Sequence, residues 1–369
     1  MSLLRRALAP IAMSAVAVAG AFAPASAAAS EPAVGAVYVL GNQASGNEVL
    51  EFERAADGTL SAPQAFATGG TGTGAGLGSQ GAVVLDDEGQ YLYAVNAGSD
   101  SITSFRVLDH GLRLVDVASS GGDQPTSLTV HDGLVYVLNA GGDGNIHGFT
   151  VSKGDLTPLA GSARALSGTA TAPAQVSFSP DGEQLVVAER ATQKLDLYSV
   201  GDHGYVTDHI VASSAGVTPF GFGFDKREHL IVSEAFGGAA DASAVSSYDV
   251  EDDALEVVSA SVPTTETAAC WIAITGNGKF AYAGNAGTNS VTGYRIGRDG
   301  SLTILDADGK TGDALAGVTD LALSSDSAFL YGRLGNGSVG AWAVNEDGSL
   351  VDVGAFPGLP ARPAGIAAR

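Results

Sequence analysis

Cysteine is almost absent from this sequence. Cys270 is the single cysteine among 369 residues, so no disulfide can form within the chain. Burial of apolar side chains must therefore stabilise the fold, and a chain of this length is ample for that. Helical periodicity is also missing throughout, and the 51 glycines are typical of a turn-rich all-β protein.

Basic residues are scarce as well. The sequence has 18 Lys and Arg residues against 40 Asp and Glu residues, which gives a formal net charge of −22. A chain this acidic repels nucleic acids and anionic membrane surfaces, so we expect neither as a partner. The acidity is typical of a soluble domain.

Long apolar runs are missing beyond the N-terminus. Arg5 and Arg6 precede an apolar run, and Ala25-Ser26-Ala27 follows as a cleavage site. This pattern predicts a secretory signal peptide over residues 1–27, although the export route (general or twin-arginine) stays open. No other stretch approaches the roughly 18 apolar residues of a membrane span. We therefore expect a secreted monomer that does not insert into membranes, with one domain over residues 28–369.

The sequence contains an internal repeat. Its clearest copy, residues 270–308, has four short apolar-polar alternating runs separated by turns such as Asn277-Gly278 and Asp299-Gly300, which favour hairpins. The second run of each copy recurs at a spacing of about 49 residues, at Tyr38, Tyr93, Tyr136, Val186, Ile231, Tyr282 and Tyr331. Seven four-stranded units predict an all-β, seven-bladed β-propeller of antiparallel blades.

The two ends of the chain predict how the ring closes. Residues 36–41 match a second strand with no first strand before them, whereas residues 363–368 match the first strands of other copies. We therefore expect the C-terminal strand to complete the first blade, which removes an open sheet edge. Residues 69–78, which are rich in glycine, are interpreted as a flexible loop between the first two blades.

Binding sites of propellers usually lie at one mouth of the central channel, in loops that enter the first strands or follow the second strands. Several polar and aromatic residues occupy those positions and are our candidate ligand-binding residues. They are Gln124, Gln175, Phe220, Trp271, Asp320, Arg190 and Arg333. No histidine falls at these positions, so the commonest general base near neutral pH is missing there.

Glu189 and Glu234 end second strands in adjacent blades, where three other blades have asparagine. If these carboxylates meet at one side of the mouth, they could share a proton or bind a divalent cation. The alternative is that each forms a surface ion pair, for example Glu189 with Arg190 or Lys194. The asparagines fit a structural role in capping the loop backbone.

The aromatic candidates also have two interpretations. Trp271 or Phe220 could stack on a polar, uncharged ligand, or both could plug the channel and exclude water. Cys270, beside Trp271, fits a small buried residue better than a nucleophile, since no histidine is placed to activate it.

Two segments, FSPDGEQLVVAERATQKLDLYSV (residues 178–200) and KFAYAGNAGTNSVTGYRIGRDG (residues 279–300), resemble the lactonase-type seven-bladed propellers. That family includes 6-phosphogluconolactonase and the fungal 3-carboxymuconate lactonising enzyme, a carboxymuconate cyclase. The resemblance implies a proline-histidine element entering the fourth blade, a Pro-Arg-His element entering the fifth, and an Asn-Glu pair after it. Here these positions read Pro173-Ala174-Gln175, Pro219-Phe220-Gly221 and Ser233-Glu234.

Because the arginine and both histidines of that pattern are missing, we expect a non-catalytic or catalytically altered member. It would bind a polar small molecule, or a cell-surface or extracellular partner, at the channel mouth. The alternative is an extracytoplasmic lactone hydrolase or cycloisomerase that uses Glu234 as its base. A third hypothesis is a metal-assisted lactonase with Glu189 and Glu234 as ligands. The favoured interpretation needs no cofactor and no metal.

Overall fold

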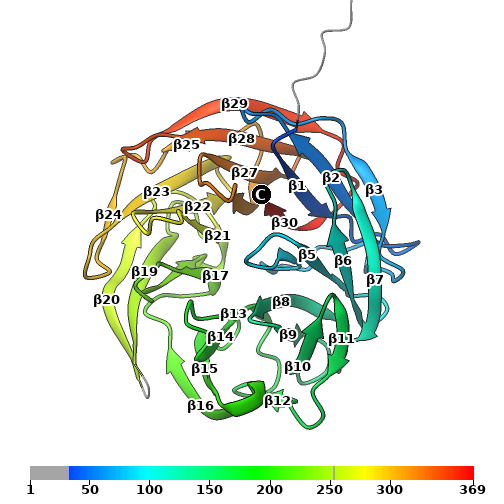
Figure 1. Cartoon of the computed structure of the whole chain (residues 1–369). Coiled ribbons are helices and arrows are strands. Elements are labelled where there is room, and N and C mark those ends of the chain that lie inside the picture. Colours follow the sequence, from blue (N-terminus) through cyan, green and yellow to red (C-terminus); the bar gives the residue numbers. More distant parts are fainter. Residues whose placement is uncertain (1–32, 252–253) are drawn as a thin grey trace, which may run out of the picture. The chain divides into compact units, whose positions relative to one another are not determined.

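The computed structural model of the chain describes residues 33–251 and 254–369. The predicted signal peptide, residues 1–27, lies outside the described residues. Seven antiparallel sheets surround a central channel (Figure 1). Each sheet has four strands in hairpin order, and two sheets carry a fifth, two-residue strand. This architecture confirms the predicted all-β, seven-bladed propeller.

The strands of the first four blades follow one another from the channel outwards. Blade 1 contains β30 (Ala364–Ala368), β1 (Gly35–Leu40), β2 (Glu48–Arg54) and β3 (Gln64–Ala67). Blade 2 contains β4 (Val83–Leu85), β5 (Tyr91–Asn96), β6 (Ser101–Val107) and β7 (Leu112–Ser119). Blade 3 contains β8 (Pro125–His131), β9 (Leu134–Asn139), β10 (Asn145–Ser152), β11 (Asp155–Pro158) and the short β12 (Arg164–Ala165). Blade 4 contains β13 (Pro173–Phe178), β14 (Gln184–Glu189), β15 (Lys194–Val200) and β16 (Val206–Ser213).

The other three blades follow the same order. Blade 5 contains β17 (Pro219–Phe224), β18 (Leu230–Glu234), β19 (Ala244–Glu251) and β20 (Ala254–Pro263). Blade 6 contains β21 (Ala269–Ile274), β22 (Phe280–Asn285), β23 (Ser290–Ile296), β24 (Leu302–Ile304) and the short β25 (Gly312–Asp313). Blade 7 contains β26 (Val318–Leu323), β27 (Phe329–Leu334), β28 (Ser338–Val344) and β29 (Leu350–Pro357).

Two 3-10 turns, η1 (Asp202–Gly204) and η2 (Phe236–Gly238), are the helical elements of the described residues. No helix among residues 33–251 and 254–369 is long and apolar enough to cross a membrane.

The ring closes as the sequence predicts. β30 pairs with β1 in antiparallel register, with Val37 opposite Ala368 and Val39 opposite Ile366. Figure 1 shows β30, in red, beside β1, in dark blue. Arg54 reinforces this closure, since its Nε donates a hydrogen bond to the carbonyl oxygen of Arg369 at 3.1 Å.

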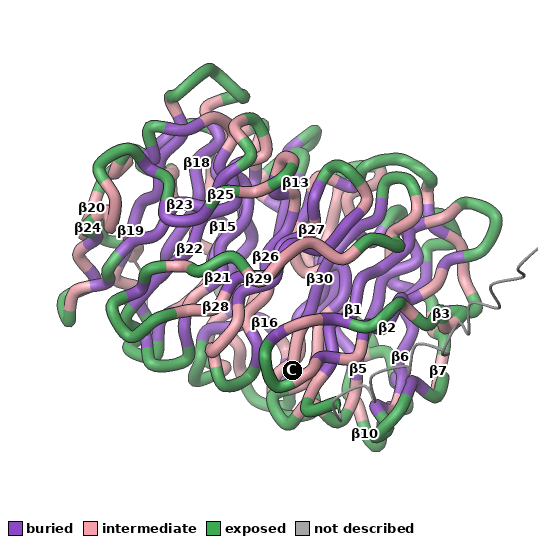
Figure 2. Tube along the Cα trace, turned by 90° about the horizontal axis from the view of Figure 1, so that it is seen from above, coloured by how far each residue is buried: buried purple, intermediate pink, exposed green. Residues whose placement is uncertain are grey.

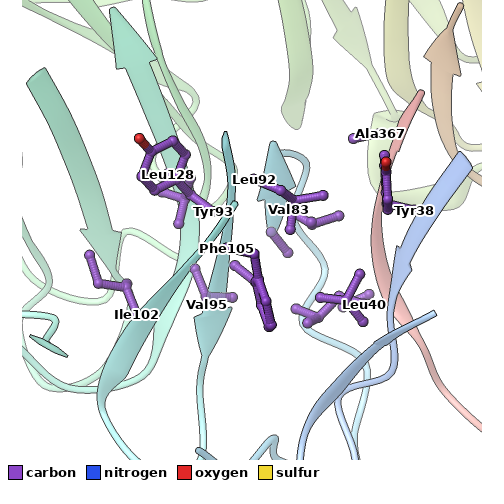
Figure 3. Packing of buried hydrophobic residues seen from close by; sticks show 14 of the residues in the cluster. Tyr38, Leu40, Val83, Leu92, Tyr93, Val95, Ile102, Phe105, Leu128 and Ala367 are labelled. Carbon is purple, nitrogen blue, oxygen red and sulfur yellow. The ribbon is translucent and has the colours of Figure 1, made fainter. Parts of the chain in front are cut away.

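The second strand of each blade is buried on both faces, because it lies between two neighbouring blades. In β22, for example, all six residues are buried, whereas the outermost strand of blade 2, β7, exposes half of its residues. Figure 2 shows the same arrangement, with buried strands in the middle of the disc and exposed loops along its edges. Aromatic and branched side chains such as Tyr93 and Phe105 fill the spaces between blades (Figure 3). The recurrent tyrosine of the sequence repeat is therefore a core position.

Candidate functional site

A short segment crosses the mouth of the channel. β4 has only three residues because the chain before it leaves blade 2 and runs over the opening. The Ser79 hydroxyl donates to the carbonyl of Thr126 in blade 3 at 2.8 Å. The side chain of Gln80 exchanges two hydrogen bonds with the backbone of Ile272 in blade 6, at 2.7 and 3.0 Å. Residues 79–80, called the crossbar below, therefore join opposite sides of the ring.

The crossbar needs space that glycine supplies. A Cβ atom at Gly221 would lie 2.1 Å from the Oε1 atom of Gln80, so no larger residue fits there without a shift. Gly221 occupies one of the positions where the resembling family carries its Pro-Arg-His element. The altered motif and the crossbar are thus sterically linked.

Residues 69–78 lead to the crossbar and are fastened to blade 1. The side chain of Asn42, which is 1% exposed, donates to the carbonyl of Ala75 at 2.6 Å and accepts from the amide of Thr73 at 3.0 Å. The sequence predicts a flexible loop here because of its glycines. The structure instead holds the segment by hydrogen bonds to a buried side chain, which composition alone does not reveal.

Phe220 and Trp271 pack together under the crossbar. They are 6% and 7% exposed, their ring centroids are 5.2 Å apart in an edge-to-face arrangement, and the guanidinium of Arg190 lies 5.1 Å from the Phe220 centroid. The indole Nε1 of Trp271 donates to the carbonyl of Ser79 at 3.0 Å. We call Phe220, Trp271 and Arg190 the aromatic plug. Burial raises the pKa of the neighbouring Cys270 thiol to about 12, so this thiol is not an activated nucleophile.

The two candidate glutamines differ in accessibility. The amide of Gln175 is 7% exposed and exchanges hydrogen bonds with the backbone of Phe222 in the next blade, at 3.0 and 2.7 Å. Gln175 therefore joins blades 4 and 5, and both its amide oxygen and its amide nitrogen are engaged in this contact. Gln124 is exposed, and the hydrogen bond from its backbone amide to Asp100 at 2.8 Å leaves its side chain accessible.

Glu234 is fully buried rather than placed at the open mouth. Both carboxylate oxygens accept hydrogen bonds from hydroxyls, from Ser246 at 2.5 Å and from Ser261 at 2.6 Å. Burial raises the pKa of Glu234 above its usual range. The expectation that this carboxylate faces the mouth is therefore wrong, because the side chain points outwards along its own blade to β19 and β20.

Glu189 is also fully buried and forms no surface ion pair with Arg190 or Lys194. Its carboxylate accepts hydrogen bonds from the amide of Ser167 at 3.0 Å and from the hydroxyls of Ser167 and Thr192. Burial alone would raise the pKa of Glu189, but these bonds and one to Asp196 bring it below its usual range. The two glutamates occupy the same place as Asn96 and Asn285, whose amides donate to Thr103 and Thr292 inside the blades.

Sequence reasoning missed Asp196, a buried residue in β15. The amide of Ser167 lies 3.0 Å from Glu189 and 3.2 Å from Asp196, so the two carboxyl groups are adjacent. His209 Nε2 lies 3.3 Å from the other oxygen of Asp196. Burial and the neighbouring glutamate raise the pKa of Asp196 to about 8. The sequence did offer one signal, because Asp196 lies between Leu195 and Leu197 in a strand that is buried between two blades.

The other side of the mouth is open. A cavity of about 720 Å³, called the mouth cavity below, lies between blades 6, 7 and 1. Its lining comprises residues 76–79, Trp271, Thr319, residues 333–337 and residues 359–364. Two arginines, Arg333 and Arg362, belong to this lining, whereas no carboxylate does. Sequence reasoning missed Arg362, although it precedes Pro363 as Gln124 precedes Pro125.

Arg333 is held at the base of this cavity. Its guanidinium donates to the carbonyls of Thr319, at 2.5 Å, and Pro363, while its Nε has no hydrogen-bond partner among the described residues. Asp320, which is 1% exposed, follows the lining residue Thr319 but does not itself line the cavity. Burial raises the pKa of Asp320 to about 7, although the charge of Arg333 acts in the opposite direction. Asp320 is therefore a buried neighbour of the cavity and not part of its lining.

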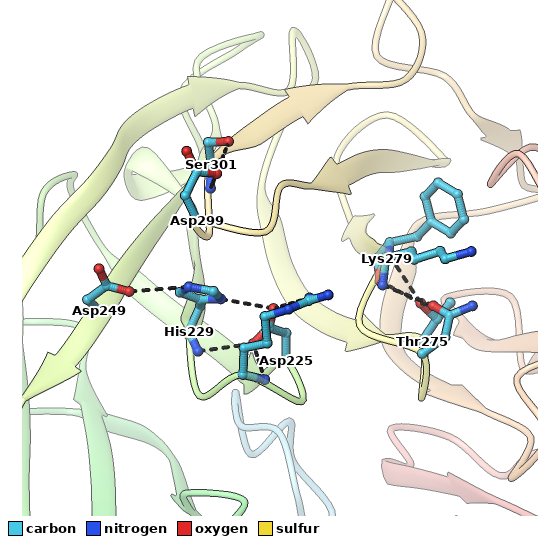
Figure 4. A network of polar contacts seen from close by, with 10 residues as sticks. Asp225, His229, Asp249, Thr275, Lys279, Asp299 and Ser301 are labelled. Atoms are coloured by element: carbon cyan, nitrogen blue, oxygen red, sulfur yellow. Dashed lines mark hydrogen bonds and ion pairs between the residues drawn. The ribbon is translucent and has the colours of Figure 1, made fainter.

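The histidines lie elsewhere. None of the six contributes to the mouth cavity. Figure 4 shows His229 in the hairpin between β17 and β18, where its ring lies 2.9 Å from Asp225 and 3.3 Å from Asp249. Among residues 33–251 and 254–369, no three His, Cys, Asp or Glu side chains are grouped so that they could hold a metal ion.

Comparisons with known proteins agree with this architecture. Residues 27–169 match the family described as lactonase, 7-bladed β-propeller. Over these residues the chain is similar to that family, and its fold as a whole is a seven-bladed β-propeller. Solved structures with the same fold match nearly the whole chain. A putative 6-phosphogluconolactonase from Bacteroides uniformis is 16% identical, with a TM-score of 0.71 over 91% of this chain and 99% of that one. The Pseudomonas aeruginosa periplasmic gluconolactonase is 15% identical, with a TM-score of 0.69 over 90% and 99%.

Sequence relatives of this lactonase-like propeller match only a part of it. An uncharacterised protein of Staphylococcus aureus strain N315 is 40% identical over 76 residues, which are 20% of this chain. The matched segment spans 22% of the length of that relative. A second Staphylococcus aureus protein, from strain USA300, is 38% identical over 76 residues, with the same coverage.

Proposed function

We propose that this lactonase-like propeller binds a small anionic molecule in the mouth cavity and is non-catalytic or catalytically altered. The observation that carries the proposal is the charge of the lining. The sequence has more than twice as many acidic as basic residues, yet the lining contains two arginines and no carboxylate. Such a local reversal of charge attracts anions and repels cations.

The rest of the lining supports a small molecule over a macromolecular partner. A cavity of about 720 Å³ is within the usual size range of small-molecule sites. Trp271, Leu77 and Pro360 supply apolar surface beside the arginines. We therefore favour an anion with a flat or apolar portion, in place of the uncharged ligand that the sequence suggested.

The reduced catalytic competence rests on the altered motif positions. The segments Pro173-Ala174-Gln175 and Pro219-Phe220-Gly221 lack the histidines that the resemblance implies, and Gln175 and Gly221 are both used to build the fold. Glu234 is surrounded by serine hydroxyls. The alternative, an extracytoplasmic lactone hydrolase or cycloisomerase with Glu234 as base, would need this carboxylate to leave its buried position.

Calorimetric titration with inorganic phosphate and with D-gluconate tests the binding proposal, with D-glucose as the neutral control. Arg362→Asn should weaken the binding of either anion about tenfold, which is the usual loss for a charge-assisted hydrogen bond. The matched control is Arg298→Asn, which removes an exposed arginine outside the cavity. Failure of both anions to bind at millimolar concentration would refute the proposal, as would equal weakening by the two variants.

A turnover assay separates the binder from the enzyme. The proposal predicts no hydrolysis of 6-phosphogluconolactone or muconolactone above a heat-killed control. Turnover that disappears in Glu234→Gln, but survives in the equivalent substitution Glu189→Gln, would establish the lactonase alternative.

We further propose export of the mature chain, because residues 1–27 carry the features of a signal peptide. N-terminal sequencing of protein from the culture medium should give a start near Ala28. An intact start at Met1 would contradict it.

A further inference from the structure

Tyrosine hydroxyls tie neighbouring blades together in this ring. Tyr136 donates a hydrogen bond to the carbonyl of Gly204 at 2.8 Å, and Tyr282 donates to the carbonyl of Gly348 at 2.9 Å. Tyr331 donates to the carbonyl of Gly58 at 3.0 Å. Each acceptor lies in the hairpin between the third and fourth strands of the next blade. Three of the five tyrosines at this repeated position therefore share one structural function.

Tyr93 occupies the same position in blade 2 without such a partner. It is 2% exposed, and its hydroxyl has no hydrogen bond among the described residues. The reason is Ser104, which pairs with Tyr93 across β5 and β6. The Ser104 hydroxyl donates at 2.5 Å to the carbonyl of Gly154. This carbonyl is the acceptor that corresponds to those of the other three tyrosines, whose bonds to the next blade we call tyrosine latches.

In the latched blades the residue paired with the tyrosine has no hydroxyl. It is Gly148 opposite Tyr136, Gly293 opposite Tyr282 and Ala341 opposite Tyr331. Blade 2 therefore keeps the tie between blades through Ser104, and the hydroxyl of the largely buried Tyr93 stays unused. Burial raises the pKa of Tyr93 far above its usual range, so this hydroxyl remains neutral.

Tyr93 lines a cavity of about 320 Å³ between blades 2 and 3, which we call the blade 2–3 cavity. It lies among the hairpins opposite the mouth loops. Four carboxylates, one lysine and one histidine belong to its lining: Asp86, Asp87, Glu88, Asp132, Lys153 and His131. His131 lies 3.9 Å from Asp87 and 3.7 Å from Asp132. The cavity is therefore negatively charged, opposite in sign to the mouth cavity.

We propose that the blade 2–3 cavity is a second binding site, which takes the ammonium group of a small aliphatic amine. An ammonium nitrogen donates hydrogen bonds, and the Tyr93 oxygen accepts one while the carboxylates of Asp87 and Glu88 balance the charge. A neutral phenol surrounded by surface carboxylates is a poor ligand set for Mg²⁺ or Ca²⁺, which prefer several converging oxygens. This site does not depend on the proposed function of the mouth cavity.

Calorimetric titration with putrescine tests this site. Tyr93→Phe should weaken putrescine binding about tenfold, as expected for the loss of a hydrogen bond to a charged group, and should leave the melting temperature unchanged. The matched control, Tyr282→Phe, removes a latch and should lower the melting temperature without changing putrescine affinity. Asp87→Asn should weaken binding severalfold and reduce its dependence on salt.

Two outcomes would overturn the proposal. One is the absence of putrescine binding to the wild-type chain at millimolar concentration. The other is equal putrescine affinity of Tyr93→Phe and the wild type, since binding would then reflect only the acidity of the surface.

Discussion

The two sides of the channel mouth differ in what fills them. On the side of blades 4 to 6, the crossbar and the aromatic plug occupy the space, and the candidate carboxylates lie buried inside the blades. On the side of blades 6, 7 and 1, the mouth cavity stays open and carries Arg333 and Arg362. The fold is the same on both sides. The difference arises from local segments, because the crossbar fills one side and residues 359–364 line the other.

One short segment covers one side of the mouth and leaves the other side open. Residues 79–80 leave blade 2 and reach blades 3, 4 and 6. They cover the side that carries Gln175, Phe220 and Gly221. The open side depends instead on the segment that closes the ring, since Arg333 holds the carbonyl of Pro363. The proposed binding site and the ring closure therefore share residues.

The largest effect should come from removing that closing segment. Deletion of residues 363–369 removes β30 and exposes the inner edge of β1, including the apolar contacts of Ile366. We expect insoluble protein, or a melting temperature lower by about 10 °C or more, because several kcal/mol of packing are lost. Differential scanning calorimetry measures this. A truncated chain that melts within a degree or two of the full-length chain would show that β30 is dispensable.

The second effect concerns the filled side. Trp271→Ala should reduce the free energy of unfolding by about 3–5 kcal/mol, the usual cost of truncating a buried tryptophan. Trp271→Phe keeps most of the volume and loses the bond to Ser79, so it should cost about 1 kcal/mol. Denaturant unfolding measures both variants. If Trp271→Ala is as stable as the wild type, the plug hypothesis fails and a dedicated ligand contact is favoured.

Much of this fold could be predicted from the sequence, since tyrosines, glycine turns and strand alternation recur at one spacing. The orphan strand at residues 363–368 predicted the closure for the same reason. The site was harder to predict. Glu234 was assigned to the mouth because it ends a strand, yet side-chain direction places it inside the blade. The crossbar could not be foreseen, because the contact between Gln80 and Ile272 joins residues far apart in the sequence and follows no repeat.

The third effect is a dependence of stability on pH. Burial raises the pKa of Asp196 to about 8 and that of Asp320 to about 7, from an ordinary value of 3.8. The folded chain thus holds protons that the unfolded chain has released. Their contribution to the free energy of unfolding is fully present below about pH 4, and it is lost as the pH rises towards 8. Asp196→Asn should therefore show a shallower fall in melting temperature between about pH 5 and 8.5 than the wild type.

An exposed carboxyl provides the control for that measurement. Asp352→Asn should leave the pH dependence of the melting temperature unchanged, because Asp352 is exposed in β29. Parallel curves for Asp196→Asn and the wild type would mean that Asp196 is already ionised in the folded chain at low pH.

The smallest effect comes from a backbone feature that both sides share. Thr218, before blade 5, and Arg362, before blade 1, are in the left-handed region with φ of 60° and 55°. This conformation costs a β-branched residue about 1 kcal/mol, whereas asparagine adopts it readily. Thr218→Asn should therefore stabilise the fold by up to about 1 kcal/mol, and Arg362→Asn by less, since arginine is not β-branched.

Phosphate affinity should fall only in Arg362→Asn, because Thr218 lies outside the lining of the mouth cavity. Denaturant unfolding and phosphate titration of the same two variants separate backbone strain from binding. If Thr218→Asn weakened phosphate binding as much as Arg362→Asn, the distinction between a filled and an open side would be wrong.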